Sequence, residues 1–593
     1  MLSNLKYYYW QHQKKFDRGA LYLSLLFSTV TLIHLGYSTN PVLWGILGNS
    51  ILWAFYLIFI LYFFRTLLGY WTGERRKAEL FAGLFIFLFF LLIALARLYD
   101  QDGSGTLSQS EWVYLGIFSI TLVEVSRSSL FLDKLYFNPT ILFVISFLGL
   151  ILMGAFLLML PNSVKSGIPL DFVDAAFMAT SAVCITGLTV VDVANTFSPF
   201  GQSILLVLIQ LGGLGIMTFT GFFGYFFSGG FSYKNQLMYG EILGQNKVGA
   251  VVNTLLKIIF VTLLVEAMGA VFIFFAVPKT HFDSYGEHLF FSVFHAVSAF
   301  CNAGFSIAEN GLGNPAYRFN YNLQLILVSL FILGGLGFII VFNSYTYIKR
   351  LLINFYNRIL HGKAFIHKAW VISFNARLMA WSSLILIVFS TLIFFLFEYN
   401  NSLSEHEGFF HKLIAALFMG NSSRTSGFSM MDTNLLSLPM ILIIMLLMWI
   451  GASPGSTGGG IKNTTFSIAI LNIISLAKGR DQLEIFHRKI SQDSVNKAFA
   501  IIMLSFVAIG LSIALLSFTD GEKGLKALAF ESFSAYATCG LSLGITSQLS
   551  DTGKIIIAAT MFTGRVGLLT LLVAMIKNIR NRNYSYPEEK VLF

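Results

Sequence analysis

Residues 179–192 read ATSAVCITGLTVVD, and this pattern of small residues, a serine and one glycine returns three more times along the chain. The later copies are HAVSAFCNAGFSIAE at 295–309, GNSSRTSGFSMMD at 420–432 and ESFSAYATCGLSLG at 531–544. An apolar residue follows the glycine in every copy, and successive glycines are 117, 123 and 113 residues apart. Recurrence at a near-constant spacing indicates an internal repeat of four units.

Each copy lies between two long apolar runs but is itself too short and too polar to cross a bilayer. Non-helical backbone at membrane depth is tolerated only where protein buries it or where it lines a water-filled cavity. One such hairpin would be an ordinary turn, but four in register around one axis would form a ring of backbone carbonyls that replaces an ion's hydration shell. Glycine suits this role because it adopts positive φ without a Cβ clash.

We therefore predict an ion-selectivity filter built from three consecutive residues of each copy. The twelve residues are Ile185, Thr186, Gly187, Asn302, Ala303, Gly304, Thr425, Ser426, Gly427, Thr538, Cys539 and Gly540.

The composition is that of a membrane protein. Of 593 residues, 56% are hydrophobic and 11% are charged, and the mean hydropathy is +0.73. No soluble globular class has this composition, and apolar runs of about 20 residues indicate a polytopic, all-α membrane protein in contact with lipid. The net charge of +10 does not indicate nucleic acid, because the basic residues lie in short loops between spans, where they mark the cytoplasmic side. We expect Cys184, Cys301 and Cys539 to be small packing residues rather than a disulfide framework.

The expected organisation has five parts. A four-helix transmembrane extension occupies 1–137, with spans near 19–38, 43–66, 80–98 and 112–126. Four span–pore-loop–span units around one pore occupy 138–248, 249–375, 376–490 and 491–593, the last with a cytoplasmic tail. Basic clusters at 349–377, 478–489 and 577–582 fall on one side of the membrane, which places the pore loops toward the outside.

The acidic loop at 100–111, DQDGSGTLSQSE, resembles an EF-hand calcium loop. Asp100, Asp102, Ser104, Thr106 and Glu111 occupy ligand positions, although serine replaces the usual Asp or Asn at position five. The alternative interpretation is a polar turn between two membrane spans, and the sequence leaves both open. A pore that reports calcium through this loop is a further hypothesis.

The second spans of the four units are expected at 200–227, 323–347, 436–477 and 554–576, and the span of the third unit contains a break. The apolar run ending at Ile450 stops at GASPGSTGGGIK, residues 451–462, which cannot continue a helix. We predict a gate inside the filter, as an alternative to a kinked, packed helix. The predicted gate residues are Gly451, Ser453, Pro454, Gly455, Ser456, Thr457, Gly458, Gly459, Gly460 and Arg565.

Arg565 lies well inside the last span, where a charge usually faces a cavity or a partner. Three roles are open: a positive barrier to cations, a donor to the carbonyls of the broken segment, or an ion pair with Glu266. Asp192, Glu309 and Asp432 follow the filter segments, and they either concentrate cations at the outer mouth or are ordinary loop charges. A membrane enzyme is disfavoured, because the spans contain no paired carboxylates or His/Asp clusters.

The four copies, WIGASPGSTGGGIK at 449–462 and MFTGRVGLLT at 561–570 closely resemble the Trk/Ktr/HKT superfamily of potassium transporters, in particular its TrkH/KtrB membrane subunits. The resemblance runs from about residue 138 to the C-terminus and includes a terminal YPEEK. It implies one pore per chain, a homodimer in the plasma membrane (the bacterial inner membrane), and potassium uptake. It also implies that Gly451–Gly460 is an intramembrane gating loop with Arg565 as its basic companion.

In this superfamily a serine at the first filter glycine accompanies sodium transport, so four glycines favour K+, with a sodium or mixed transporter as the alternative. The resemblance further implies separate cytosolic nucleotide-binding RCK (TrkA/KtrA-like) subunits, since this chain has no dinucleotide fingerprint of its own. The four N-terminal spans and the acidic loop depart from the compact form of the family.

Overall fold

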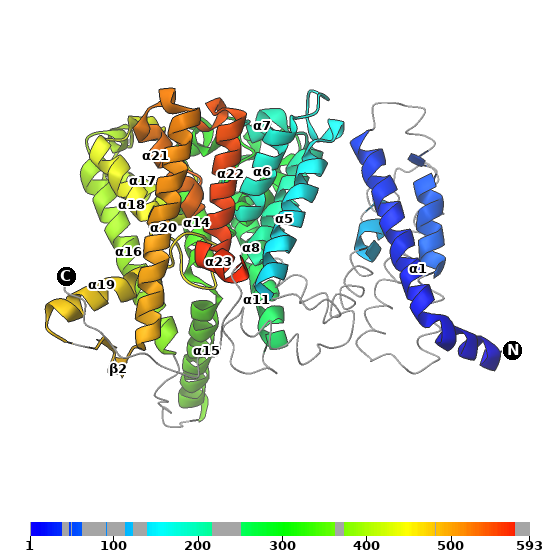
Figure 1. Ribbon diagram of the computed structural model, residues 1–593, viewed down its shortest axis with the longest axis horizontal. Coiled ribbons are helices and arrows are strands. Elements are labelled where there is room, and N and C mark those ends of the chain that lie inside the picture. The colour runs from blue at the N-terminus through cyan, green and yellow to red at the C-terminus, as the bar shows by residue number, and fades with distance from the viewer. Residues whose placement is uncertain are drawn as a thin grey trace.

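The computed structural model describes residues 2–37, 47–48, 50–61, 91, 113–114, 116–121, 139–215, 251–361, 373–480 and 482–575. Within these residues the chain is almost entirely helical, which confirms the predicted all-α class (Figure 1). The strands described are β1 (Glu484–Ile485) and β2 (Arg488–Lys489), an antiparallel hairpin in the loop between α19 (Asn463–Ala477) and α20 (Gln492–Thr519).

One order of elements occurs four times: a long helix, a shorter helix ending at one of the four predicted filter segments (185–187, 302–304, 425–427 and 538–540), and a third helix. The first unit has α5 (Pro139–Leu158), α6 (Phe172–Cys184) and α8 (Pro199–Leu214), and the second has α11 (Val251–Ala276), α12 (Tyr285–Phe300) and α14 (Tyr321–Leu336). The third has α16 (Phe374–Glu398), α17 (Phe409–Thr425) and α18 (Leu438–Trp449), and the fourth has α20 (Gln492–Thr519), α21 (Leu525–Ala537) and α22 (Asp551–Val566). We call α6, α12, α17 and α21 the pore helices.

The four units close into a ring through a repeated contact. The third helix of each unit packs against the pore helix of the next: α8 on α12, α14 on α17, α18 on α21 and, closing the circle, α22 on α6. The C-terminal ends of the pore helices, and the segments that follow them, are therefore held together by neighbours on both sides.

The third helix of every unit ends at a glycine or at the broken segment, which differs from the prediction of one break only. α8, α14 and α22 end at Gly215, Gly337 and Gly567, with φ of +75°, +84° and +85°. The chain then continues as α15 (Phe338–His361) after α14, bent by 102°, and as α23 (Leu568–Met575) after α22. Positive φ ends a right-handed helix, and glycine adopts it most readily. Continuous spans at 323–347 and 554–576 were therefore wrong.

Buried acids fix the third helices of units three and four. Glu398, at the end of α16, accepts hydrogen bonds from the backbone N–H (2.9 Å) and the hydroxyl (2.6 Å) of Ser437, which caps α18. Asp520, directly after α20, accepts the corresponding pair from Ser550, the cap of α22, at 2.7 and 2.8 Å. An acid placed at a helix N-terminus satisfies donors that would otherwise be unpaired.

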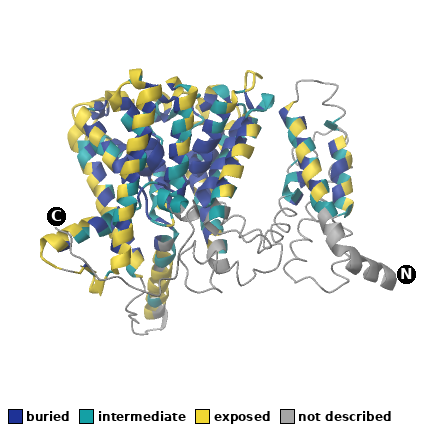
Figure 2. Ribbon diagram, in the orientation of Figure 1, coloured by how far each residue is buried: buried dark blue, intermediate teal, exposed yellow. Residues whose placement is uncertain are grey.

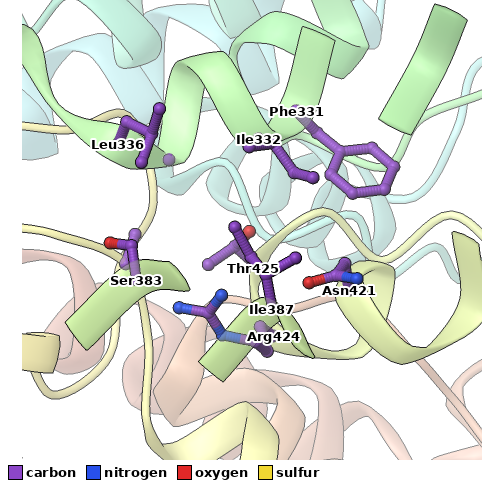
Figure 3. A pocket seen from close by; sticks show the side chains of 10 residues that line it. Phe331, Ile332, Leu336, Ser383, Ile387, Asn421, Arg424 and Thr425 are labelled. Atoms are coloured by element: carbon purple, nitrogen blue, oxygen red, sulfur yellow. The ribbon is translucent and has the colours of Figure 1, made fainter. Parts of the chain in front are cut away.

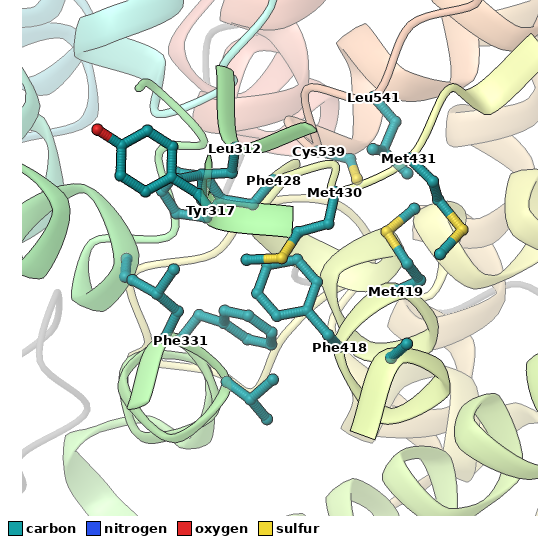
Figure 4. Close-up of a cluster of buried hydrophobic side chains, with 14 of the residues drawn as sticks. Leu312, Tyr317, Phe331, Phe418, Met419, Phe428, Met430, Met431, Cys539 and Leu541 are labelled. Carbon is teal, nitrogen blue, oxygen red and sulfur yellow. The ribbon is translucent and has the colours of Figure 1, made fainter. Parts of the chain in front are cut away.

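The apolar core surrounds the filter segments, while the lipid-facing sides of the outer helices carry exposed apolar residues (Figure 2). The apolar residues that follow the four glycines, Leu188, Phe305, Phe428 and Leu541, are at most 2% exposed. Figure 4 shows one of the two large clusters, in which Phe428, Cys539 and Leu541 pack with Phe418 and Met419. Tight packing behind the segments restricts their movement.

The described residues contain four helices that are long and apolar enough to cross a membrane, or five if α14 and α15 count as one bent span. One of the four, Gly19–Gly36, belongs to α1 (Leu2–Gly36), which Figure 1 shows standing beside the four-unit body. The Asn162 side chain donates to the Leu35 carbonyl at 2.7 Å and joins α1 to the first unit. The predicted span at 80–98, apart from residue 91, and the whole acidic loop lie outside the described residues.

Candidate functional site: a ring of four glycine segments

The four predicted filter glycines meet in one closed ring. A Cβ added to Gly187 would lie 2.5 Å from the carbonyl oxygen of Ala303, and one added to Gly304 would lie 2.5 Å from that of Ser426. A Cβ on Gly427 would meet the Cys539 carbonyl, and one on Gly540 would meet that of Thr186. Each glycine thus abuts the carbonyl before the next glycine around the ring, and the fourth abuts the first.

All four glycines have positive φ, between +69° and +98°. Three segments also place a non-glycine residue in the left-handed region two positions earlier: Ile185 (φ 58°), Asn302 (φ 59°) and Thr538 (φ 49°). In these three segments, the N–H of the residue after the left-handed one donates to the carbonyl of a pore-helix serine at 2.8–2.9 Å. This bond closes the end of the helix as a Schellman motif. This strained backbone ends each helix abruptly and turns the chain toward the ring.

The third segment differs from the others. Thr425 remains in α17, and Ser426 has φ −99°. The pore-helix serine explains the difference: Ser422 lies five residues before Gly427, whereas Ser181, Ser298 and Ser534 lie six residues before their glycines. One residue fewer removes the left-handed position.

The same serines brace the segments from behind. The hydroxyls of Ser181 and Ser534 accept the N–H groups of Gly187 and Gly540 at 3.1 and 3.0 Å. Those of Ser298 and Ser422 donate to the carbonyls of Phe305 and Phe428. The serine in each repeated copy is therefore a structural part of the ring.

Two buried titratable residues brace the second and fourth segments, and the sequence analysis missed them. In the fourth, Glu531 accepts the hydroxyls of Ser542 and, at 3.0 Å, Thr546. In the second, His295 donates from Nδ1 to the Phe291 carbonyl, which leaves Nε2 to accept the Ser306 hydroxyl at 2.9 Å. Both lie nine residues before their glycine, and their serine partners lie two after it. This shared spacing was the available signal.

The broken segment, residues 451–462, packs against the bases of the filter segments. Its ends are joined by the bridge between Ile450 and Ile461 and by a bond from Gly451 N–H to the Ile461 carbonyl at 2.8 Å. A Cβ on Gly458 would lie 3.1 Å from Thr425 Cγ2, and one on Gly459 would meet the Thr538 side chain. The segment has no room for side chains at these two positions.

Side-chain hydrogen bonds tie the broken segment to the second and third filter segments. The Thr425 hydroxyl donates to Asn302 Oδ1 at 2.9 Å, and Asn302 Nδ2 donates to the Thr457 hydroxyl at 2.8 Å. Thr457 in turn donates to the Phe300 carbonyl at 3.1 Å. Ser453 and Thr457 also bond through their N–H groups to the carbonyls of Gly335 and Gly334.

Arg565 hydrogen-bonds the carbonyl of Thr457 and, at 2.8 Å, that of Gly212. It therefore connects the broken segment to the first unit. No ion pair joins it to Glu266 in the described structure, where Glu266 accepts from Gln210 at 3.1 Å. Of the three roles left open for Arg565, the contacts match the donor to the broken segment.

A second repeated pattern locates Arg565. The sequences Gly212–Gly215, Gly334–Gly337 and Gly564–Gly567 read GGLG, GGLG and GRVG. In each, a Cβ on the first glycine would meet a pore-helix carbonyl, that of Val183, Phe300 or Tyr536. Arg565 is thus the second residue of its pattern, as Gly213 and Gly335 are of theirs. The fourth unit has a cationic residue at this place, whereas the first and second units have glycine.

Two of the three acidic residues that follow the predicted filter segments have local structural roles. Asp192 caps α7 (Val193–Thr196) by accepting the N–H of Asn195 at 2.8 Å, and Asp432 accepts that of Asn434 at 2.9 Å. Glu309 is exposed. Asp192 and Asp432 therefore make the hydrogen bonds of capping residues. The three cysteines are free and fully buried.

The helical fold, with its long apolar helices, is that of a multi-pass membrane protein, and the family match identifies it as a transporter rather than an enzyme. Residues 119–585 match the TrkH family of cation transport proteins, and the chain belongs to that family.

Its relatives agree with this assignment. The chain is 34% identical over 457 residues to the Ktr system potassium uptake protein B of Bacillus subtilis, covering 77% of this chain and 96% of that one. It is 33% identical over 465 residues to the potassium/sodium uptake protein NtpJ of Enterococcus hirae, covering 77% and 97%. The crystal structure of the potassium transporter TrkH from Vibrio parahaemolyticus superposes with a TM-score of 0.59 at 17% identity, covering 84% of this chain and 97% of that one.

Proposed function

We propose that this chain is the pore-forming subunit of a potassium-uptake system and that the ring of four glycine segments is its selectivity filter. The observation that carries the proposal is the closed contact between each filter glycine and the carbonyl before the next one. Rings of backbone carbonyls replace the hydration shell of potassium. The names of the relatives, potassium uptake protein B and potassium/sodium uptake protein, support potassium as the transported ion.

In the same proposal the broken segment is the gate. Its contacts with Asn302, Thr425 and Thr538 support this, because a segment on the pore-helix side of the ring would obstruct an ion that has passed the filter. Arg565 holds it there from the first unit. The basic clusters at 349–377, 478–489 and 577–582 support a cytoplasmic location for that side.

We further propose that the chain works as a homodimer with separate cytosolic RCK-type subunits. This rests on the resemblance to the Trk/Ktr/HKT superfamily. Calcium binding by the loop at 100–111 stays a prediction from the sequence.

Mixed potassium and sodium transport is the second candidate. It is favoured by the relative named as a potassium/sodium uptake protein, which is nearly as similar as the potassium uptake protein. Against it stands the glycine at all four ring positions, since no side chain narrows or polarises one quarter of the ring.

The deciding experiment is cation flux into proteoliposomes that contain this chain alone. Potassium, rubidium and sodium would be compared at a fixed voltage. Selective potassium and rubidium flux supports the first proposal, and equal sodium flux supports the second. If no cation moves, the experiment is repeated with Gly455–Gly460 deleted. Flux through the deletion variant shows that the gate was closed, and no flux shows that the chain is not a cation pore.

A further inference from the structure

Arg424 is a buried cation that has no partner among the described residues. It lies in the last turn of pore helix α17 and is 7% exposed. In the described part of the chain, no hydrogen bond or ion pair involves its guanidinium, and Nε is fully enclosed without an acceptor. An unpaired charge is costly to bury, so a guanidinium in this position needs a counter-charge or an acceptor.

Arg424 lines a cavity of about 20 Å³. The cavity lies between α14, α16, α17 and the broken segment, and Figure 3 shows the Arg424 side chain extending toward Ser383. About 10–15 Å³ of such space is enough for one water-sized particle. The cavity therefore has room for a single small ion or a single water.

The lining favours a negative occupant. The polar lining residues besides Arg424 are Ser383, Asn421 and Thr425, and no carboxylate is among the lining residues. Asn421 donates to Thr391 and to the Leu417 carbonyl, and Thr425 donates to Asn302. The hydrogens of Asn421 and Thr425 are therefore engaged elsewhere, and Ser383 Oγ shares a hydrogen bond with Ser453 Oγ in which either hydroxyl can donate. The charged N–H groups of Arg424 and at most the Ser383 hydroxyl are the donors left for an occupant.

We propose that this cavity is a binding site for one small monovalent anion of the chloride class, held as the counterion of Arg424. The anion accepts hydrogen bonds from the guanidinium and cancels its charge. A water molecule of the same size accepts the hydrogen bonds but leaves the charge uncompensated, so it relieves only part of the cost.

The site is connected to the broken segment. Ala452 lines the cavity, and Ser383 Oγ lies 3.1 Å from Ser453 Oγ. Asn463 Nδ2 donates to both serines, at 2.8 and 2.9 Å. An occupant therefore stabilises the observed position of residues 451–462. The effect on flux rests on the proposed gate, whereas binding itself does not.

The first test uses bromide as an anomalous scatterer. Crystals of the full chain grown in potassium bromide are expected to show one anomalous peak inside the cavity, next to the Arg424 guanidinium. A cavity that contains only water density, with no bromide peak, overturns the proposal. This experiment needs no variant, so it decides the question even if substitutions at Arg424 prevent folding.

The second test measures thermal unfolding at constant potassium with chloride, bromide or gluconate as the anion. Gluconate is too large for the cavity, so wild-type Tm is expected to be higher in chloride, by about 2 °C at saturation. Arg424→Gln abolishes the difference, and Arg424→Lys retains part of it. Arg377→Gln, which removes an exposed charge from α16, leaves the difference unchanged and controls for screening. A chloride effect that persists in Arg424→Gln places the anion elsewhere and overturns the site.

Failure of this site leaves the filter proposal intact. Anion binding is read by diffraction and unfolding, and potassium selectivity is read by flux in either salt.

Discussion

The amide nitrogen of Asn302 lies 2.8 Å from the hydroxyl oxygen of Thr457, so a filter segment and the broken segment share a direct hydrogen bond. The bond is one step in a directed chain from Thr425 through Asn302 and Thr457 to the Phe300 carbonyl. A change in the position of the broken segment therefore removes a support from the base of the second filter segment.

Thr457→Val is expected to raise potassium flux. Valine keeps the shape of threonine but removes the hydroxyl, which weakens the observed position of the broken segment by about 1–2 kcal/mol. This free energy corresponds to a factor of about 5–30 in the ratio of molecules whose broken segment has moved away to molecules that keep it in the observed position. The measurement is rubidium uptake into proteoliposomes. Thr346→Val, whose hydroxyl bonds only within its own helix, should leave uptake unchanged. Equal or reduced uptake by folded Thr457→Val would argue against a gate.

Gly187→Ser is expected to lower the preference for potassium over sodium by about tenfold, which corresponds to about 1.4 kcal/mol. The new Cβ would lie 2.5 Å from the Ala303 carbonyl and would displace that part of the ring. Reversal potentials under biionic conditions measure the preference. Gly167→Ser is the control, because Gly167 has φ +68° but no atom within 4 Å of an added Cβ. A preference equal to that of wild type would contradict the filter assignment.

Deletion of Gly455–Gly460 is expected to raise flux strongly while keeping the preference for potassium. The deletion removes the residues against Thr425 and Thr538 but leaves the four-glycine ring in place. Concentration-dependent rubidium uptake and competition by sodium measure the two effects separately. A deletion variant that folds but conducts no faster would show that this segment is not the barrier.

Glu531→Ala is expected to weaken selectivity and lower Tm, because Ser542 and Thr546 lose a shared buried acceptor. Unsatisfied buried groups of this kind cost about 1–3 kcal/mol each. Glu531→Gln keeps an acceptor oxygen of the same size and should retain most of both properties. If alanine and glutamine behave alike, the carboxylate oxygen is not what supports the segment. His295→Ala tests the equivalent position in the second segment.

Asp520 predicts a dependence of stability on pH. Burial raises its pKa, but hydrogen bonds from Ser550 and Thr519 lower it by more, so the pKa of this loop carboxyl lies below its usual value. A carboxyl whose pKa is depressed by folding adds stability above its unfolded pKa of about 3.9, and this contribution disappears as pH falls through the folded pKa. Wild-type Tm should therefore fall more steeply than that of Asp520→Asn below about pH 4. Parallel curves would exclude this role.

The fourfold repeat and the helical class followed from the sequence because each copy carries its own glycine, serine and flanking apolar runs. The break at Gly451–Gly460 was evident for the same reason, since a cluster of glycines with a proline cannot continue a helix. Single glycines are weaker signals, and Gly215, Gly337 and Gly567 were read as interior to continuous spans. Only their alignment with one another, in GGLG, GGLG and GRVG, shows that all three end helices.

Side-chain partners were less predictable. Arg565 and Glu266 were the evident charges within the spans, and pairing them was a reasonable hypothesis. Arg565 instead reaches the carbonyl of Thr457 in the broken segment and that of Gly212 in the last turn of α8, because an interrupted helix and a helix end both leave backbone acceptors free. The buried Arg424 was overlooked because a basic residue beside a filter segment resembles an ordinary loop charge until its burial is known.

The ring described above joins four segments of one polypeptide. In a channel assembled from four identical subunits, every substitution appears four times and the symmetry of the site is preserved. Here a single codon change alters one quadrant, and the shortened third segment, with Ser422 one residue closer to its glycine, already shows such a change in place. Each quadrant is therefore free to diverge independently, and in the proposed filter an ion would be coordinated by four related but unequal segments.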